Sequence, residues 1–177
     1  IPAPAVTLIV IGIPITVTAC TSSTIIVTAK DSFGNTAIGY TGTVHFTSTD
    51  GAAALPGDYT FTTADAGAHT FNATLKTAGS RSVTATDTAN ATITGTQSGI
   101  TVNAGKATTF KIVIVPTSPS VNIPADMTVN AVDKNNNIDP TYNGTVEFDS
   151  LPTTVILPGP SSITGGTRPF VGGITFT

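Results

Sequence analysis

Short segments in which apolar and polar residues alternate recur along the chain, and this period of two predicts half-buried β-strands. In residues 40–46, the side chains of Tyr40, Val44 and Phe46 are expected to face a core, while His45 faces water. Clusters of Gly, Pro, Asp and Asn separate the segments, and no window of useful length has helical periodicity. About seven strands at spacings of roughly 8–12 residues predict a β-sandwich or barrel. The other strands are predicted at residues 8–13, 24–30, 59–63, 68–76, 81–87 and 91–102.

The most apolar run of the chain, residues 8–17, is interrupted by Gly12 and Pro14. A membrane helix needs about 20 apolar residues, and a proline inside the run disfavours any helix. We therefore expect a buried β-strand in this run and no membrane span.

The chain repeats itself when it is shifted by about 102 residues, with a gap-free match over roughly sixty positions. Such a fixed period is typical of a tandem array, and its length is that of an immunoglobulin-like sandwich. We therefore expect an all-β fold of tandem immunoglobulin-like β-sandwiches, with repeat 1 at residues 1–103. Repeat 2, at residues 104–177, is expected to be incomplete and to lack its last two strands. The matched segments include 27–31 with 129–133, 40–46 with 142–148, and 55–57 with 157–159.

A sandwich without its last two strands would expose the core face that carries Tyr142, Val146 and Phe148. Two strands bury about five or six large side chains, each worth roughly 1.5–3 kcal/mol. That loss is comparable with the net stability of a domain, which is about 5–15 kcal/mol. Two outcomes remain open: the polypeptide continues past Thr177, or another chain donates the strands, and repeated donation would build an open filament. Tyr142, Val146 and Phe148 are therefore a candidate strand-acceptor face.

Composition narrows the range of functions. Charged residues make up 10% and aromatic residues 6% of the chain, Trp is absent and the formal net charge is −3. Nucleic acid is not an expected partner, because there is no basic excess to neutralise phosphates. The chain has one Cys and two His, and we identify no catalytic constellation, cofactor site or metal site. The sequence therefore predicts a protein that is not an enzyme and needs no cofactor.

Several single residues have a functional and a purely structural interpretation. Cys20 could form an interchain disulfide, but a small buried or turn residue is the stronger interpretation. Asp31 with Asn35, and Asp133 with Asn137, could offer oxygen ligands to Ca²⁺. Each turn supplies one carboxylate, however, and Asp and Asn commonly cap turns with their own side chains. We therefore interpret both as turn residues.

The two histidines are not expected to share a site. His45 is matched by Glu147 in the repeat, and a conserved role in a metal site or in catalysis would not exchange a base for an acid. His69 lies far from His45 in the sequence. Glu147 lies between two residues that are expected to face the core, so it points outward. That direction disfavours a Lys–Asn isopeptide crosslink assisted by a buried carboxylate.

Three Asn-x-Thr triplets match the acceptor pattern for N-glycosylation. They begin at Asn72, Asn90 and Asn143. Thr fills about one position in five, far above average usage, so such triplets also arise by chance. These three residues are candidate glycan carriers, and outward-facing Thr residues are candidates for O-linked sugar.

Residues 27–35 and 40–46 resemble bacterial immunoglobulin-like repeats, similar in style to invasin-type and filamin-type domains. Residues 64–71, 75–79 and 83–87 share the resemblance. It implies tandem sandwiches in large extracellular or cell-surface proteins, such as stalks, adhesins, fibres and spacer modules of secreted enzymes. It carries over no catalytic residue.

The expected function is therefore a non-enzymatic structural module of an extracellular fibre, filament, stalk or adhesin, with strands of a neighbouring subunit as one way to complete it. The expected partners are further immunoglobulin-like repeats, or copies of the chain itself, and a glycan. The alternative is an accessory carbohydrate-binding or spacer module of a secreted enzyme. A carbohydrate-binding module usually presents exposed aromatic side chains on a flat face, and most aromatic residues here fall at predicted core positions.

Overall fold

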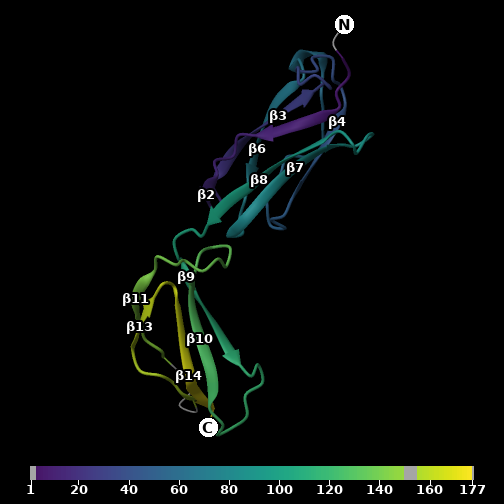
Figure 1. The fold of residues 1–177 in the computed structure, drawn as a ribbon. Helices are drawn as coiled ribbons and strands as arrows, with labels where there is room; N and C mark the ends of the chain where they lie inside the picture. The colour runs from purple at the N-terminus through teal and green to yellow at the C-terminus, as the bar shows by residue number, and fades with distance from the viewer. Residues whose placement is uncertain (1–2, 150–154, 177) are drawn as a thin grey trace. The chain divides into compact units, whose positions relative to one another are not determined.

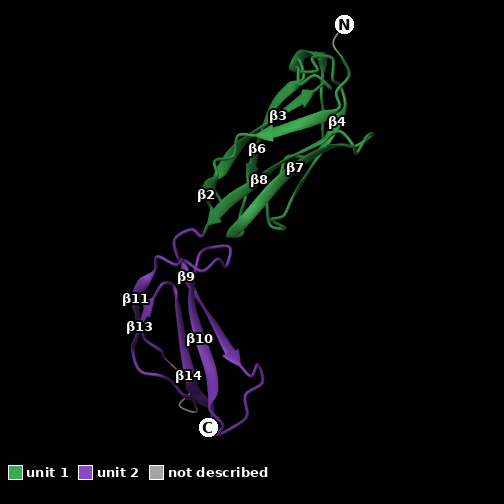
Figure 2. Cartoon of the chain, in the orientation of Figure 1, with its two compact units in different colours: residues 1–103 green, residues 104–177 purple. Residues whose placement is uncertain are grey.

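A computed structural model describes residues 3–149 and 155–176 of the chain. The chain divides into two compact units, unit 1 at residues 1–103 and unit 2 at residues 104–177 (Figure 2). Strands dominate both units (Figure 1), and the helical structure of the described residues is one 3₁₀ turn, Thr63–Asp65. The prediction of an all-β fold is confirmed. No helix in this part of the chain is long and apolar enough to cross a membrane.

Unit 1 is a sandwich of two sheets, one with strand order β1-β3-β6 and the other with order β2-β8-β7-β4-β5. All neighbours pair antiparallel except β2 and β8, which are parallel. Strand β1 thus belongs to one sheet and β2 to the other, in an immunoglobulin-like arrangement. The strands are β1 (Thr7–Ile11), β2 (Thr16–Thr18), β3 (Ser22–Lys30), β4 (Thr43–Ser48), β5 (Tyr59–Thr60), β6 (Ala68–Thr74), β7 (Gly79–Asp87) and β8 (Thr94–Asn103).

The core of unit 1 follows the alternation of each strand, because successive side chains of a strand point to opposite faces of its sheet. Val44 and Phe46 on β4 are buried, as is Tyr40 just before it, while His45 between them is exposed. The predicted orientation of this segment is therefore confirmed.

Strand β2 was not predicted, because Gly12 and Pro14 interrupt the apolar run. The run divides there into two strands that join different sheets. Gly12 has a φ of 119°, and a Cβ at this position would lie 2.7 Å from the carbonyl oxygen of Thr24. Glycine is suited to this break, because it adopts a positive φ at little cost and leaves room for the neighbouring backbone.

Unit 2 is built on one sheet of order β11-β13-β14-β10-β9, and β12 pairs with β14. Its buried apolar residues include Met127, Val129, Val146, Ile163 and Ile174. The strands are β9 (Thr109–Val115), β10 (Ala125–Val132), β11 (Asn143–Val146), β12 (Val155–Ile156), β13 (Ser161–Thr164) and β14 (Thr167–Phe176).

Two strand pairs of unit 2 have the registers of two pairs of unit 1. Val10 lies opposite Val27 in β1–β3, and the matched residues Ile112 and Val129 lie opposite each other in β9–β10.

The same holds for the second pair of strands. Val44 lies opposite Tyr59 in β4–β5, and Val146 lies opposite Ser161 in β11–β13. Strands β9, β10, β11 and β13 thus correspond to β1, β3, β4 and β5, and β14 pairs with β10 as β6 pairs with β3. Among the described residues of unit 2, β2, β7 and β8 have no counterpart strand.

Candidate functional site

Strand β9 of unit 2 exposes positions that β1 buries in unit 1. Leu8 and Val10 are 2% and 3% exposed, whereas the matched Phe110 and Ile112 are 44% and 52% exposed. The difference has a physical cause, because β8 packs against β1 in unit 1. The hydroxyl of Thr7 donates a hydrogen bond to the carbonyl oxygen of Thr94 on β8 at 3.0 Å. Strand β9 has no such cover in the part of unit 2 that the structure describes.

Strand β11 has one open edge. In unit 1, β4 pairs with β5 on one edge and with β7 on the other. In unit 2, β13 occupies the edge of β11 that corresponds to the β5 side. Among residues 104–149 and 155–176, no strand pairs with the other edge, so the backbone groups that β4 pairs with β7 have no ladder partner there.

The three residues of the predicted acceptor face have different exposures. Val146 is 6% exposed, because it packs in the core of unit 2 with the β10, β13 and β14 side chains. Tyr142 and Phe148 are half-buried. The Tyr142 ring meets Phe110 edge-on at 5.5 Å, and the Phe148 ring meets Phe170 edge-on at 5.4 Å. The exposed part of the face lies on β9 and between β9 and β11.

Two hollows lie along this face. One has a volume of about 180 Å³ and lies between the β9 side chains Phe110 and Ile112 and the β11 side chain Val146. The other has a volume of about 410 Å³ and is lined by residues 107–110 and Tyr142. We define the acceptor face as Phe110, Ile112, Tyr142, Val146 and Phe148.

The sequence indicated part of this face and missed the rest. Tyr142, Val146 and Phe148 were found from the alternation of their segment. Phe110 and Ile112 were missed, although the repeat matches them to Leu8 and Val10. In unit 1, β8 covers the matched positions of β1, and a pattern of apolar residues does not show which neighbouring strand covers them.

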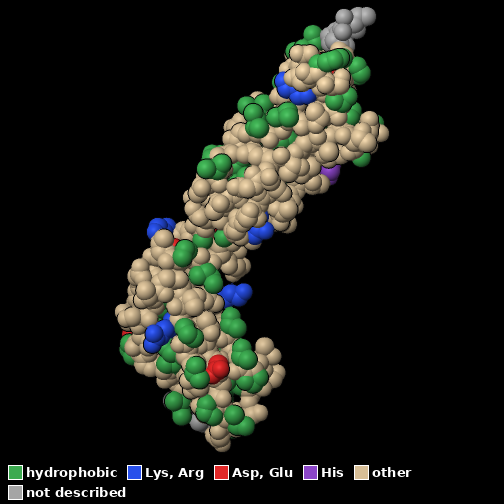
Figure 3. Space-filling view, in the orientation of Figure 1, with side chains coloured by type: hydrophobic (Ala, Val, Ile, Leu, Met, Phe, Trp, Pro, Cys, Tyr) green, Lys and Arg blue, Asp and Glu red, His purple; other side chains and the backbone are tan. Residues whose placement is uncertain are grey.

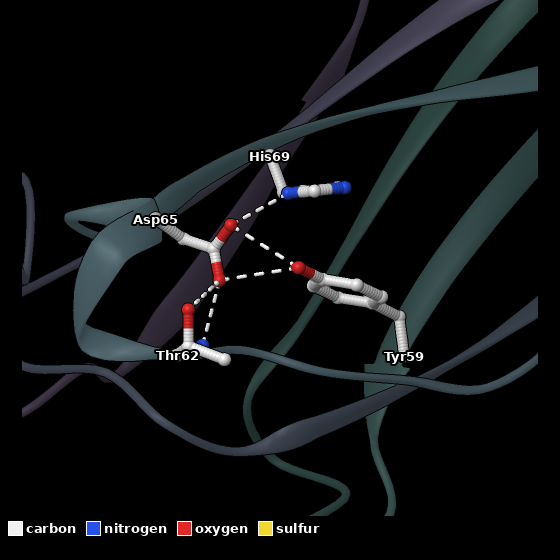
Figure 4. Close-up of polar contacts among 4 residues, drawn as sticks. All are labelled: Tyr59, Thr62, Asp65 and His69. Atoms are coloured by element: carbon white, nitrogen blue, oxygen red, sulfur yellow. Dashed lines mark hydrogen bonds and ion pairs between the residues drawn. The ribbon is translucent and has the colours of Figure 1, made fainter.

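A cluster of four polar side chains surrounds the 3₁₀ turn of unit 1 (Figure 4). Asp65 accepts hydrogen bonds from the backbone N–H and hydroxyl of Thr62 at 2.6 and 2.8 Å. The Nδ1 atom of His69 on β6 lies 2.6 Å from Asp65 Oδ1, and the Tyr59 hydroxyl donates to the same carboxylate at 3.2 Å. The ring of Tyr59 stacks on that of His69 at 4.1 Å.

These contacts explain the electrostatics of the cluster. The backbone hydrogen bond from Thr62 lowers the pKa of Asp65 most, and the pKa falls to about 2 although burial opposes the shift. Burial and the neighbouring Asp65 carboxylate both raise the pKa of Tyr59. The carboxylate thus closes the 3₁₀ turn and ties it to β5 and β6, which is a structural role.

The two histidines lie at separate positions, each beside an aspartate. His45 Nδ1 is 2.6 Å from Asp58 Oδ1, and both side chains are 56% exposed. Among the described residues, no group of three or more His, Cys, Asp or Glu side chains is gathered as a metal site would require.

The two Asp-x-x-x-Asn turns have matching hydrogen bonds. Asp31 Oδ1 accepts the backbone N–H groups of Phe33 and Asn35, each at 2.9 Å. Asp133 Oδ1 accepts the N–H of Asn137 at 3.0 Å, and Asp133 Oδ2 accepts the Asn137 side-chain amide at 2.8 Å. These carboxylates serve as turn caps. Burial would raise the pKa of Asp133, but the hydrogen bonds that it accepts outweigh burial and lower the pKa.

Cys20 lies in a left-handed turn between β2 and β3, with a φ of 66°. Its backbone N–H donates to the carbonyl oxygen of Leu75 at 2.8 Å. The matched Asn122 has a φ of 59° and donates in the same way to Phe176 at 2.6 Å. The position therefore has the geometry of a turn in both units.

The three candidate glycan carriers are exposed, and they differ in how their side chains are held. Asn90 Oδ1 accepts the N–H and hydroxyl of Thr92, and Asn143 Oδ1 accepts the N–H of Gly165 at 3.3 Å. Asn72 is an outward-facing residue of β6. Glu147 is exposed, as its position in the alternation predicts.

Neutral hydroxyl side chains bridge neighbouring strands on the surface of unit 1. Thr84 and Thr96 join β7 and β8 through their hydroxyls at 2.8 Å, and Thr86 and Thr94 do the same at 2.8 Å. On the side of the molecule that Figure 3 shows, few charged side chains are visible. The outward face of the β7–β8 pair is therefore polar without being charged at these positions.

The strands of unit 1 define an all-β, immunoglobulin-like sandwich. No protein-family model matches the chain, and no curated protein matches it. Among solved structures, the Escherichia coli adhesin FdeC is similar, with 18% identity, 97% of this chain and 62% of that chain covered, and a TM-score of 0.48.

Surface-layer proteins are also similar to the chain. Domains 4–9 of the surface layer protein SbsC have 21% identity, with 98% of this chain and 27% of that chain covered, and a TM-score of 0.40. The S-layer protein rSbsC(31-844) has 20% identity, with 94% and 22% covered, and a TM-score of 0.34. The chain thus spans less than two thirds of each of these three chains.

Proposed function

We propose that the chain is a non-enzymatic structural module of an extracellular or cell-surface fibre, filament, stalk or adhesin, built from tandem bacterial immunoglobulin-like repeats. The single observation that carries this proposal is the pair of shared registers, β1–β3 with β9–β10 and β4–β5 with β11–β13. Tandem-repeat proteins are built from consecutive units that share one arrangement of strands. The neutral, hydroxyl-rich outer face of the β7–β8 pair fits such a role, because it stays hydrated without charge.

The mechanical part of the role rests on how β2 meets β8. Thr16, Val17 and Thr18 pair in parallel with Thr101, Val102 and Asn103. Tension applied at the two ends of unit 1 pulls β2 and β8 in opposite directions along their axes. The bonds between them, including Thr101 N–H to Ile15 O and Ala19 N–H to Asn103 O at 2.8 Å each, are then loaded together in shear.

Force spectroscopy on the whole chain tests the mechanical role. Val17→Pro should lower the unfolding force of unit 1, because proline disrupts the local strand geometry and removes a backbone donor. Val6→Pro, just outside β1, is the matched control and should leave the force closer to that of the parent chain. If unit 1 unfolds at the same force with and without Val17→Pro, the hydrogen bonds between β2 and β8 do not determine the unfolding force.

Antibody labelling of intact cells of the source organism tests the location. An antibody against unit 1 should label cells before permeabilisation. Labelling that appears only after permeabilisation would contradict an extracellular or cell-surface role.

Glycan attachment at Asn72, Asn90 or Asn143 is a separate part of the proposal. Asn72 is favoured over Asn143, since an N-linked glycan is carried by the side-chain amide nitrogen, and that nitrogen of Asn143 already donates a hydrogen bond to the carbonyl oxygen of Thr141 at 3.2 Å. Mass spectrometry of the protein purified from its source tests this, and an unmodified mass for all three tryptic segments would contradict it.

The alternative of a carbohydrate-binding module expects clustered exposed aromatic rings. Of the aromatic side chains, which all lie in the described part of the chain, Phe33 and Phe110 are exposed, at 82% and 44%. They belong to different units. No specific observation favours this alternative over the structural role.

A further inference from the structure

The acceptor face of unit 2 has a template in unit 1. There, the β7–β8 hairpin covers the matched residues: β7 pairs with β4, and β8 lies across β1. The inward side chains Val83, Ala85 and Ile100 of this hairpin are 0% exposed. In the described residues of unit 2, Phe110 and Ile112 are exposed and no strand pairs with one edge of β11. These are the positions that the hairpin covers in unit 1.

We propose that the acceptor face binds an antiparallel β-hairpin with the side-chain pattern of residues 79–103, supplied by a polypeptide segment other than residues 1–177. The first strand of the hairpin pairs with the open edge of β11, and its second strand lies across β9. The inference names the partner of the structural module proposed above, but it rests on the geometry of unit 2 and not on the location of the protein. Strand addition of this kind satisfies an open edge through backbone hydrogen bonds, while side-chain pockets give specificity.

The first strand of the hairpin requires an aspartate opposite Val146. In unit 1, Asp87 lies opposite Val44 and accepts a hydrogen bond from the Tyr40 hydroxyl at 2.5 Å. Unit 2 keeps the matching phenol, Tyr142. Among the described residues, the Tyr142 hydroxyl has no hydrogen-bond partner.

The phenol of Tyr142 is held in the position that such an aspartate needs. A Cβ at Gly144 would lie 2.6 Å from the Tyr142 hydroxyl oxygen, so the phenol packs directly over this glycine. In unit 1, a Cβ at Gly42 would overlap both the Tyr40 hydroxyl and Asp87. The Tyr-x-Gly segment thus prepares the same site in both units.

The second strand requires a glycine where it crosses Phe110. A Cβ at Gly95 would overlap the carbonyl oxygen of Leu8, so β8 approaches β1 closely at that point. Phe110 is the matched residue in unit 2. The neighbouring Thr109 matches Thr7, whose hydroxyl donates to the carbonyl oxygen of the residue before Gly95.

A second copy of the chain is a poor source of this hairpin. Its β7–β8 segment is the centre of its own unit 1, where Val83, Ala85 and Ile100 are fully buried. Releasing that segment would require unit 1 of the second copy to unfold. A hairpin that is not already committed to another core avoids this cost.

A peptide of residues 77–104 is the probe, titrated into the whole chain labelled with ¹⁵N. The peptide should bind saturably. When it is bound, hydrogen exchange should be at least tenfold slower at the β11 amides and also slower at the β9 edge, while exchange at the β1 and β4 amides of unit 1 does not change. A Gly95→Val peptide, which keeps length and charge, should bind at least tenfold more weakly, because its side chain prevents close approach.

The hydroxyl contact is tested by combining one variant on each side. Tyr142→Phe in the chain should weaken binding of the parent peptide about tenfold, as for one hydrogen bond to a carboxylate. It should leave binding of an Asp87→Ala peptide unchanged, because that peptide has no carboxylate to lose. A general disturbance of unit 2 would weaken both peptides equally.

Several results would overturn the proposal. The first is that the parent peptide does not bind at concentrations up to about 1 mM, and the second is that the parent and Gly95→Val peptides bind equally well. The third is that, without peptide, the β11 amides are already as protected from exchange as those of β4. A chain that forms dimers with protected β11 amides would identify a second copy as the occupant. If the peptide aggregates, a fusion carrying the same hairpin after a flexible linker must show the same β11 protection. None of these outcomes depends on the cell labelling, so the two proposals fail separately.

Discussion

The Tyr40 hydroxyl donates a 2.5 Å hydrogen bond to Oδ2 of Asp87, and both side chains are buried. The other carboxylate oxygen accepts the backbone N–H groups of Ala89 and Asn90 at 2.8 and 2.9 Å. Burial raises the pKa of Tyr40, and the carboxylate raises it further. Burial would also raise the pKa of Asp87, but the hydrogen bonds that it accepts lower it overall. The pair therefore remains a neutral phenol and a carboxylate, and it ties the segment before β4 to the end of β7.

Tyr40→Phe removes this hydrogen bond and leaves the ring in place. Unit 1 should lose about 2 kcal/mol of stability, because a buried carboxylate loses a donor. Amide hydrogen exchange of the β7 core measures this in the whole chain. Tyr142→Phe is the matched control in unit 2 and should change stability by less than about 0.5 kcal/mol. Equal losses for the two variants would contradict a specific role of the Tyr40–Asp87 bond.

Gly42→Ala should destabilise unit 1 through overpacking. The added methyl group would overlap the Tyr40 hydroxyl and Asp87, so the pair must move or the strand must shift. Such overpacking typically costs about 1–3 kcal/mol. Gly39→Ala is the control, because a Cβ there meets nothing within 4 Å. Urea unfolding followed by circular dichroism compares the two variants, and equal midpoints would contradict the packing argument.

Most strands of unit 1 were predictable, because one face of each strand is buried and the other is exposed to solvent. Val44 and Phe46 follow this alternation on β4. The division of the first apolar run was not predictable in the same way. It depends on Gly12 and on which sheet each half joins, and β2 is determined by its pairing with β8 rather than by its own three residues.

The polar contacts were less predictable than the strands. Tyr40 and Asp87 are 47 residues apart, and no local pattern joins them. Asp65 lies four residues before His69, yet the cluster also needs Tyr59 from another strand. The exposure of Phe110 and Ile112 depends on the absence of a covering strand in the described structure, so the same apolar pattern gives a buried strand in unit 1 and an open one in unit 2.

The Asp65 cluster should make unit 1 sensitive to acid. The pKa of Asp65 is about 2 in the folded chain and near its ordinary value of 3.8 when unfolded. The unfolded state therefore binds more protons between about pH 4 and pH 2, so this contribution is complete above pH 4 and is lost as the pH falls through that window. In the parent chain, the urea concentration at the midpoint of unfolding should fall between pH 5 and about pH 2.5. In Asp65→Asn this fall should be smaller. A ¹³C titration of the Asp65 carboxyl with its midpoint near pH 4 would contradict the assignment.

Phe61 anchors the aromatic cluster at the edge of the same sandwich. Its side chain is 1% exposed, and its ring meets those of Tyr40 and Tyr59 edge-on at 5.1 and 5.6 Å. Its backbone N–H donates a hydrogen bond to the carbonyl oxygen of Gly42 at 3.0 Å. The side chain therefore packs where the end of β5 is held next to the start of β4. Phe61→Ala should therefore cost about 3–5 kcal/mol through lost burial and the cavity left behind.

Phe33→Ala is the matched control for Phe61→Ala, because the Phe33 side chain is 82% exposed. It should change stability by less than about 0.5 kcal/mol. Hydrogen exchange of the β4 and β7 amides follows unit 1 in the whole chain, and the loss of protection in Phe61→Ala should extend to both strands. The Tyr40–Asp87 bond should weaken with them, since the Phe61 ring packs against Tyr40. Similar exchange rates in the two variants would show that the Phe61 side chain contributes little to the packing of the sandwich.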